Sequence, residues 1–227
     1  MPKALALRLS DKRIGKDDRC RQFGLLDGEA SLRIFGVILA GGAGRRMGGR
    51  DKALLMLGGQ TLLGHAQSRL APQVERIALS ANGDPARFAP DSVVLPDDGS
   101  HGPLSGILAA LDWAAPLGAT SVVSIAVDTP FFPPDLVPRL CLAAERSSGG
   151  VAVAASDGID HPTFSIWPVG LRGDLRTFLA SGAKPRVMDF ARAHDAARAV
   201  FAGDTAFINV NTPEDLAAAD AMYESTR

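Results

Sequence analysis

Short apolar runs alternate with longer stretches of mixed character from residue 31 to the end of the chain. The run Ile34–Leu39 (IFGVIL) is continuous, apolar and followed by glycines, which predicts a buried strand. Ser121–Val127 (SVVSIAV) is a second run of this kind. Shorter strands are expected at Ile77–Ser80, Val93–Leu95, Gly150–Ala155, Thr163–Trp167 and Ala199–Phe201.

The stretches between these strands carry the end signals of helices. A threonine N-cap or a proline in the first turn begins most of them. The expected helices are Thr61–Leu70, Pro103–Ala114, Pro134–Glu145, Leu171–Leu179 and Pro213–Tyr223, the last capped by Thr212. Strands that alternate with helices favour a mostly parallel sheet covered on both faces. We therefore expect an α/β fold, with a single three-layer domain over residues 33–227 and a poorly ordered N-terminal extension over residues 1–32.

Composition narrows the class of protein. The chain has 227 residues, 46% of them apolar and 22% charged, which is enough for a sizeable core. Its formal net charge of −1 argues against a nucleic-acid or membrane-surface partner, since either normally requires a basic excess. Apolar runs stay below the roughly 18–20 residues of a membrane helix. Cys20 and Cys141 are far apart and lie in no metal-binding or disulfide pattern, which fits a cytoplasmic protein.

The segment Leu39–Lys52 (LAGGAGRRMGGRDK) directly follows the first predicted strand. Glycine permits positive φ and close backbone approach, so such a loop can wrap phosphates with its N–H groups. The segment contains no Gly-Lys pair, which excludes a P-loop. A dinucleotide fingerprint is also excluded, because Gly42-Ala43-Gly44 continues through Arg45-Arg46 to Met47 and no helix begins there.

Basic residues accompany the glycines, among them Arg45, Arg46 and Lys52. Their convergence suits a triphosphate, with its about four negative charges, better than a single phosphate. The alternative is a solvated surface loop with incidental charges, because Gly-rich segments are common.

Asp128 ends the strand SVVSIAV, and Thr129-Pro130 breaks the strand immediately afterwards. In an open parallel sheet, ligands bind beyond the carboxyl ends of the strands. A carboxylate there, opposite a triphosphate loop, is placed to hold Mg²⁺ between protein and phosphate. The alternative is a turn-forming aspartate that caps the next segment.

These motifs together resemble the molybdenum cofactor guanylyltransferases, a family of the nucleotidyltransferase superfamily with a Rossmann-like sheet. The resemblance begins with LAGGxxxRMGGxDK and continues through SAN, GPLSG, DTPF, His161-Pro162 and NVNTPEDL at 80–82, 102–106, 128–131, 161–162 and 209–216. It therefore extends over nearly all of the chain except the N-terminal extension. The ordered set is highly specific, although LAGG alone is a weak signal.

The resemblance implies transfer of GMP from GTP to the terminal phosphate of molybdopterin, with release of pyrophosphate and with Mg²⁺ as cofactor. It implies that Asp128 is the magnesium ligand and that Arg46, Lys52 and Asp128 are catalytic. The nucleotide-binding residues expected from it are Leu39, Ala40, Gly41, Gly42, Lys52, Asn82, Asp97 and Asp128. Asp98 is an alternative to Asp97, which is preferred because it follows the preceding strand at the family's spacing. Without the resemblance, Asn82 is more simply a turn residue of Asn-Gly-Asp.

The second substrate is expected near His161-Pro162 and the segment Asn209–Asp215. An attacking phosphate oxygen is already anionic at neutral pH, so this chemistry needs no general base. Two other functions stay open. One is a nucleotidyltransferase of other specificity, using CTP or a sugar or polyol phosphate, and the other is a non-catalytic nucleotide-binding module. Gly41 replaces the Ala typical of the related cytidylyltransferases and thereby removes a methyl group beside the base. The family also implies transient contacts with molybdenum insertion proteins or target-enzyme chaperones.

Overall fold

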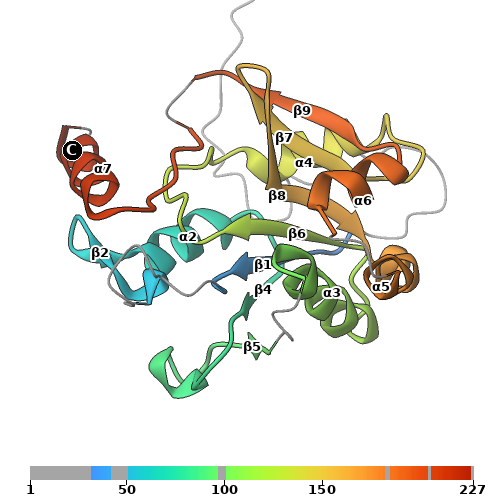
Figure 1. Ribbon diagram of the computed structural model, residues 1–227, viewed down its shortest axis with the longest axis horizontal. Coiled ribbons are helices and arrows are strands. Elements are labelled where there is room, and N and C mark those ends of the chain that lie inside the picture. Colours follow the sequence, from blue (N-terminus) through green and yellow to red (C-terminus); the bar gives the residue numbers. More distant parts are fainter. Residues whose placement is uncertain (1–31, 42–50, 97–100, 182–184, 204–205, 226–227) are drawn as a thin grey trace, which may run out of the picture. The chain divides into compact units, whose positions relative to one another are not determined.

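The computed structural model describes residues 32–41, 51–96, 101–181, 185–203 and 206–225, which belong to one compact unit (Figure 1). Its main sheet has seven strands in the order β5-β4-β1-β6-β8-β7-β9. The pairs are parallel except that β8 runs antiparallel to both of its neighbours. The strands are β1 (Ile34–Leu39), β4 (Arg76–Ser80), β5 (Val94–Leu95), β6 (Ser121–Ala126), β7 (Ala152–Ser156), β8 (Ile159–Pro168) and β9 (Ala197–Phe201).

Helices cover both faces of this sheet. They are α2 (Leu62–Leu70), α3 (Pro103–Ala114), α4 (Leu136–Ala144), α5 (Arg172–Ala180) and α6 (Val187–Ala193). A further helix, α7 (Pro213–Ser225), lies beside the short strand β2 (Met56–Leu57) (Figure 1). Alternate residues of β1 separate two cores: Ile34 and Ile38 pack with α2 and α4, whereas Phe35 and Val37 pack with α3, α5 and α6 (Figure 1). This is the period of two expected for a strand buried on both faces. The predicted three-layer α/β fold with a mostly parallel sheet is confirmed.

Strand β1 marks the point at which the chain changes direction across the sheet. The next main-sheet strand in sequence, β4, lies on one side of β1, and β6 lies on the other. At this carboxyl edge, where parallel strands β1, β4 and β6 end, backbone bonds continue the pairing beyond the strands. Ala40 N–H donates to the Ser80 carbonyl over 2.9 Å, and Val127 N–H donates to the Leu39 carbonyl over 3.2 Å. Such a switch point is where open α/β sheets bind ligands.

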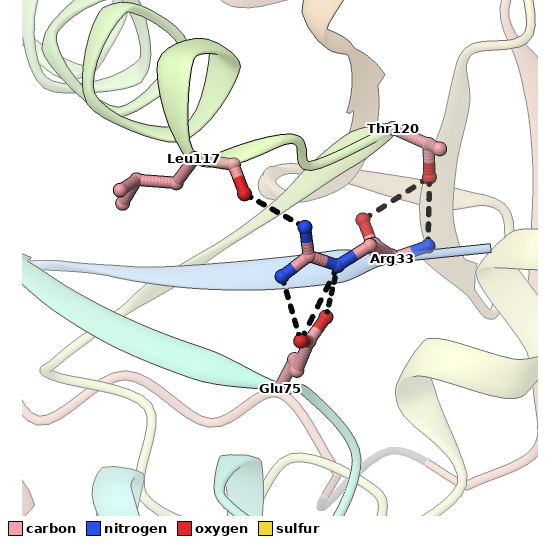
Figure 2. A network of polar contacts seen from close by, with 4 residues as sticks. All are labelled: Arg33, Glu75, Leu117 and Thr120. Carbon is pink, nitrogen blue, oxygen red and sulfur yellow. Dashed lines mark hydrogen bonds and ion pairs between the residues drawn. The ribbon is translucent and has the colours of Figure 1, made fainter. Parts of the chain in front are cut away.

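The opposite, amino edge of the same strands is tied together by Arg33 (Figure 2). Its guanidinium donates to both carboxylate oxygens of Glu75, with a shortest distance of 2.8 Å, and to the Leu117 carbonyl over 2.8 Å. Its main-chain N–H and carbonyl both bond the hydroxyl of Thr120, at 3.1 Å each. One side chain thus joins the segments before β4 and β6 to the start of β1.

Strand β9 forms one margin of the sheet. Its Val200 side chain is 62% exposed. Arg139 of α4 donates to the Val200 carbonyl, and its guanidinium carbon lies 4.2 Å from the centroid of the Phe201 ring. At the other margin, β5 has two residues.

Several elements differ from the sequence expectations. Helix α4 begins at Leu136 rather than Pro134, because Pro134 and Asp135 form a turn. Strand β8 is ten residues long and includes Pro162, which lies where the β7–β8 register shifts. Proline is tolerated there because a bulge does not use its missing N–H.

Helix α6 and the small hairpin of β2 (Met56–Leu57) and β3 (Gln60–Thr61) were not predicted. Among the described residues, no helix is both long enough and apolar enough to cross a membrane. The predicted N-terminal extension lies outside the described residues apart from Leu32.

Candidate active site

Lys52 and Asp128 meet at the carboxyl edge of the sheet, 76 residues apart in sequence. The Lys52 ammonium lies 3.1 Å from Asp128 Oδ2 and donates to Asn211 Oδ1 over 2.5 Å. The Lys52 and Asp128 side chains are 18% and 24% exposed, so the pair is partly desolvated but open to solvent on one side. Two residues that the sequence predicts to be catalytic, one in the glycine-rich segment and one after β6, therefore lie in direct contact.

Local chemistry fixes the backbone that carries Lys52. Asp51 is the N-cap of a 3₁₀ helix, η2 (Lys52–Leu54), and its Oδ1 accepts the Ala53 N–H over 3.0 Å. Ala53 is fully buried, which anchors this turn to the core. Lys52 is the first residue of the turn, so its long side chain begins from a fixed main-chain position and reaches Asp128.

The C-terminal segment, residues 209–215, is bonded to the residues that follow β6. Val210 N–H donates to the Asp128 carbonyl over 2.7 Å. The fully buried Thr129 donates its hydroxyl to Asn209 Oδ1 over 2.6 Å. These bonds place Asn211 beside Lys52. The segment that the sequence assigned to the second substrate thus also contacts Lys52.

A capping box holds the same segment at the start of α7. Asp215 Oδ2 accepts the N–H groups of Asn211 and Thr212, each over 2.9 Å, and Thr212 Oγ1 accepts the Asp215 N–H over 3.1 Å. The bond from Asn211 N–H is the largest cause of a lowered pKa of the Asp215 carboxyl, and the charge of Lys52 lowers it further. Asp215 is therefore held in its anionic form as a fixed support for Asn211.

The nucleotide-binding residues predicted at the end of β1 lie at the switch point. Leu39 and Ala40 are buried, and Gly41 is exposed. Asn82 lies in the turn after β4, two residues beyond the Ser80 carbonyl that Ala40 contacts. Gly42, Arg46 and Asp97, together with its alternative Asp98, lie outside the described residues. Among the described residues, no group of three or more His, Cys, Asp or Glu is arranged to hold a metal ion.

The GPLSG motif has a packing role that its sequence did not indicate. A Cβ on Gly106 would lie 2.3 Å from Ser80 Oγ and 2.8 Å from Leu39 Cδ2. Glycine therefore lets the first turn of α3 approach the ends of β1 and β4 closely. The N-terminal turn of α3 is brought to the carboxyl edge by this contact.

His161 lies on the other side of the edge, on the projecting part of β8. Its ring stacks on Phe207 at a centroid distance of 4.2 Å, and Nε2 lies 2.8 Å from Ser156 Oγ. Burial lowers the pKa of His161, and the charge of Asp160 partly opposes this. Because Phe207 precedes Asn209 by two residues, His161 supports the segment that reaches Lys52.

A sequence model described as the MobA-like NTP transferase domain matches residues 36–197, which include most of β1 together with Lys52, Asn82 and Asp128. The chain belongs to this family. Two curated relatives named molybdenum cofactor guanylyltransferase extend the match. One, from Cereibacter sphaeroides, is 55% identical over 192 residues, covering 84% of this chain and 97% of the relative. The other, from Mesorhizobium japonicum, is 48% identical over 201 residues, covering 85% and 97%.

A solved structure, molybdopterin-guanine dinucleotide biosynthesis protein A from Archaeoglobus fulgidus, has the same fold. It superposes with a TM-score of 0.66 at 20% identity, covering 84% of this chain and 99% of that one. The predicted family and fold are thus both confirmed.

Sequence reasoning missed three contributors to this site. Asn211 was placed near the second substrate but not on Lys52, and Asp51 and Arg87 were not singled out. Arg87 Nε lies 2.6 Å from Asp51 Oδ2. An arginine in a short Pro-Ala-Arg segment carries no local signal of this contact, because its partner is 36 residues away.

Proposed function

We propose that the Lys52–Asp128–Asn211 cluster is the centre at which this chain transfers GMP from GTP to molybdopterin. The family makes the chain a nucleotidyltransferase. Its relatives with 48–55% sequence identity are named molybdenum cofactor guanylyltransferase. The observation that carries the assignment of the site is the contact of Lys52 with both Asp128 and Asn211 at the switch point of the sheet. This contact joins the glycine-rich segment Leu39–Lys52 (the phosphate segment), the residues after β6 and the C-terminal segment in one place.

The reaction forms one P–O bond and breaks another. A phosphate oxygen of molybdopterin attacks the α-phosphorus of GTP, and the bond from that phosphorus to the bridging oxygen breaks to release pyrophosphate. The attacking oxygen is already anionic, so positioning and charge stabilisation account for the catalysis. We assign to Lys52 the neutralisation of charge on the α-phosphate and on the departing pyrophosphate. Arg46 is proposed to share this task, and Gly41, Gly42 and Asp97 to contact the nucleotide.

Asp128 fits a magnesium site of the kind shared between protein and substrate. Mg²⁺ at a triphosphate usually takes one or two carboxylates and completes its shell with phosphate oxygens and water. Asp128 offers such a carboxylate, 24% exposed, at the edge where the triphosphate is expected. When bound, Mg²⁺ would supply charge neutralisation at the α-phosphate. Lys52 provides the counter-charge to Asp128 in the free protein, and we assign its ammonium to the phosphates of bound GTP.

The proposal is tested by a turnover assay with purified molybdopterin, GTP and Mg²⁺, in which released pyrophosphate and the dinucleotide product are both measured. We expect GTP-dependent product with molybdopterin and none with sugar or polyol phosphates. Efficient turnover with CTP in place of GTP would overturn the guanylyl specificity. Product with a sugar phosphate instead of molybdopterin would overturn the assignment of molybdopterin as the acceptor.

The metal assignment is tested separately with Asp128→Asn, which keeps the shape and a hydrogen-bond acceptor for Lys52 but removes the charge. We expect wild-type folding, and a rise in the Mg²⁺ concentration needed for half-maximal activity. An unchanged Mg²⁺ requirement would contradict a role of Asp128 as metal ligand.

The specificity assignment is tested with Gly41→Ala, which restores the methyl group typical of the cytidylyltransferase loop. The ratio of kcat/KM for GTP to that for CTP is expected to fall. A ratio equal to that of the wild-type protein would remove Gly41 from the explanation of purine selection.

A further inference from the structure

Arg87 joins two parts of the chain that the proposed function assigns to the same nucleotide. It ends η3 (Pro85–Arg87), the 3₁₀ helix that follows the turn after β4. Its Nε donates to Asp51 Oδ2 over 2.6 Å, directly before the catalytic lysine. Its Nη2 donates to the Asn82 carbonyl over 2.6 Å, and its Nη1 to the Asp84 carbonyl over 2.8 Å.

The three nitrogens of one guanidinium are thus divided between two segments. The planar fork of arginine makes this division specific, because its donors point in fixed directions. The guanidinium carbon also lies 4.4 Å from the centroid of the Phe88 ring, which restricts the side chain further. The Arg87 and Asp51 side chains are 24% and 27% exposed, so their ion pair is partly shielded from solvent.

Asp51 relays this contact to Lys52. One of its carboxylate oxygens caps the turn on which Lys52 lies, and the other accepts Arg87. The position of the lysine backbone and the position of the Asn82 turn are therefore linked through a single carboxylate. The two segments otherwise come from different parts of the chain, since η2 precedes α2 and the turn follows β4.

We propose that Arg87 is a positioning residue, which sets the spacing between the nucleotide-contacting turn at Asn82–Asp84 and the phosphate-binding Lys52. This inference rests on the proposed function. A ligand that spans both segments gains from the fixed spacing, because less ordering has to occur on binding. A ligand that contacts only the phosphate segment gains little. Arg87 thus belongs to substrate recognition without touching the reacting atoms.

The test compares GTP with inorganic tripolyphosphate, which carries the phosphates without the nucleoside. Binding of both, in the presence of Mg²⁺, is measured by titration calorimetry on the wild-type protein and on Arg87→Gln. Arg87→Gln is expected to weaken GTP binding about tenfold and tripolyphosphate binding at most about twofold, in line with usual coupling between sites. A uniform loss for both ligands, or no loss for either, would overturn the positioning role.

Arg33→Gln is the matched control. Arg33 also joins a carboxylate and a backbone carbonyl through its guanidinium, but at the amino edge. It is expected to bind both ligands like the wild-type protein, whatever its effect on Tm. A GTP-selective loss in Arg33→Gln would show that any loosened strand end produces the effect, and would also overturn the proposal.

Arg87→Lys covers the case in which Arg87→Gln does not fold. A lysine keeps the charge but cannot reach all three acceptors, so the same selective loss for GTP is expected. If the wild-type protein binds neither ligand, the proposed function fails and this inference fails with it. If the wild-type protein binds GTP and both Arg87 variants bind it equally well, only the role of Arg87 fails.

Discussion

The two edges of the sheet each place a cation against a carboxylate, but the cations differ. At the amino edge, Arg33 makes a forked contact with Glu75 and also holds the Leu117 carbonyl. At the carboxyl edge, Lys52 meets one oxygen of Asp128 and the amide oxygen of Asn211. The amino-edge pair is 35% and 45% exposed, whereas the carboxyl-edge pair is 18% and 24% exposed.

This difference fits a fastening role of Arg33 and the catalytic role that we propose for Lys52. A planar guanidinium that bonds several fixed acceptors is well suited to hold strand ends in register. An ammonium is a compact charge on a flexible stem, so it can turn from a carboxylate to an incoming phosphate without losing a shaped contact. The Lys52–Asp128 pair is partly shielded from solvent, and this shielding would also strengthen a charge interaction between Lys52 and a phosphate. Arg33 therefore holds fixed contacts at one edge of the sheet, whereas Lys52 can change its contact partner at the other.

The largest expected effect comes from removing each of the two cations in turn. Lys52→Ala should lower kcat/KM for GTP by at least about 10²-fold, because one well-placed charge donor is worth that much in comparable sites. Arg33→Ala should leave kcat/KM near the wild-type value and lower Tm instead. Steady-state pyrophosphate release and thermal melts of both variants check this. Wild-type turnover by folded Lys52→Ala would contradict the comparison.

A second effect concerns glycines in the first turns of two helices. Gly106→Ala at the carboxyl edge should destabilise the protein by about 1–3 kcal/mol, the usual cost of overpacking, because the new methyl group meets Ser80 and Leu39. Gly173→Ala in α5 should leave stability unchanged or raise it, since no atom lies within 4 Å of the new methyl group. Denaturant unfolding of both variants measures the difference. Equal stabilities would mean that α3 can withdraw from the sheet without cost.

The two edges should also respond to different ranges of pH. The pKa of His161 is lowered from 6.5 by burial, so below about that pH the unfolded chain takes up a proton that the folded chain does not. The hydrogen bond from Arg33 lowers the pKa of Glu75 from 4.5, so its contribution is present above that pH and is lost in stronger acid.

We therefore expect the Tm of the wild-type protein to fall relative to His161→Phe as the pH decreases below about 6.5. Phenylalanine keeps the aromatic stack on Phe207 but cannot titrate. Glu75→Gln should differ from the wild-type protein by a constant Tm in that range and converge with it only below about pH 4.5. Melting curves recorded over this range of pH test both predictions. A difference in Tm between His161→Phe and the wild-type protein that does not change with pH would show that His161 does not cause the pH dependence.

The smallest effect is expected for Arg33→Lys. A lysine keeps the charge near Glu75 but not the forked contact or the bond to Leu117, and exposed pairs contribute little to stability. A slight decrease in Tm with unchanged GTP kinetics should result. A large drop in Tm would show that the amino edge depends on the fork more strongly than its exposure suggests.

Local signals predicted most of the fold. The bounds of β1 and α3 match the sequence prediction, because a continuous apolar run and a proline in the first helical turn are strong signals. The seven-residue helix α6 escaped prediction, since so short a helix forms mainly through the burial of Val187, Phe190 and Ala191 against the sheet. The first part of β8 escaped because Pro162 interrupts the strand pattern and is accommodated only by the bulge.

The candidate site was predictable only in part. Asp128 follows β6 and the segment that holds Lys52 follows β1, and the carboxyl ends of parallel strands lie at one edge of a sheet. Both residues were therefore expected at that edge, but their direct contact was not predicted. The contact of Lys52 with Asn211 spans 159 residues and depends on how the segment before the last helix reaches the carboxyl edge of the sheet, which no local pattern encodes. The link from Arg87 to Asp51 has the same character, since it is created by tertiary packing alone.

Arg139 has a consequence for how this protein behaves in concentrated solution. A margin strand with an exposed valine and open backbone groups is a template on which another chain can add a strand and begin an aggregate. The guanidinium of Arg139 occupies the Val200 carbonyl, and the opposite margin ends in a strand of two residues. Both margins of the sheet therefore discourage strand addition, and the enzyme keeps a broad, largely parallel sheet without inviting edge-to-edge self-association.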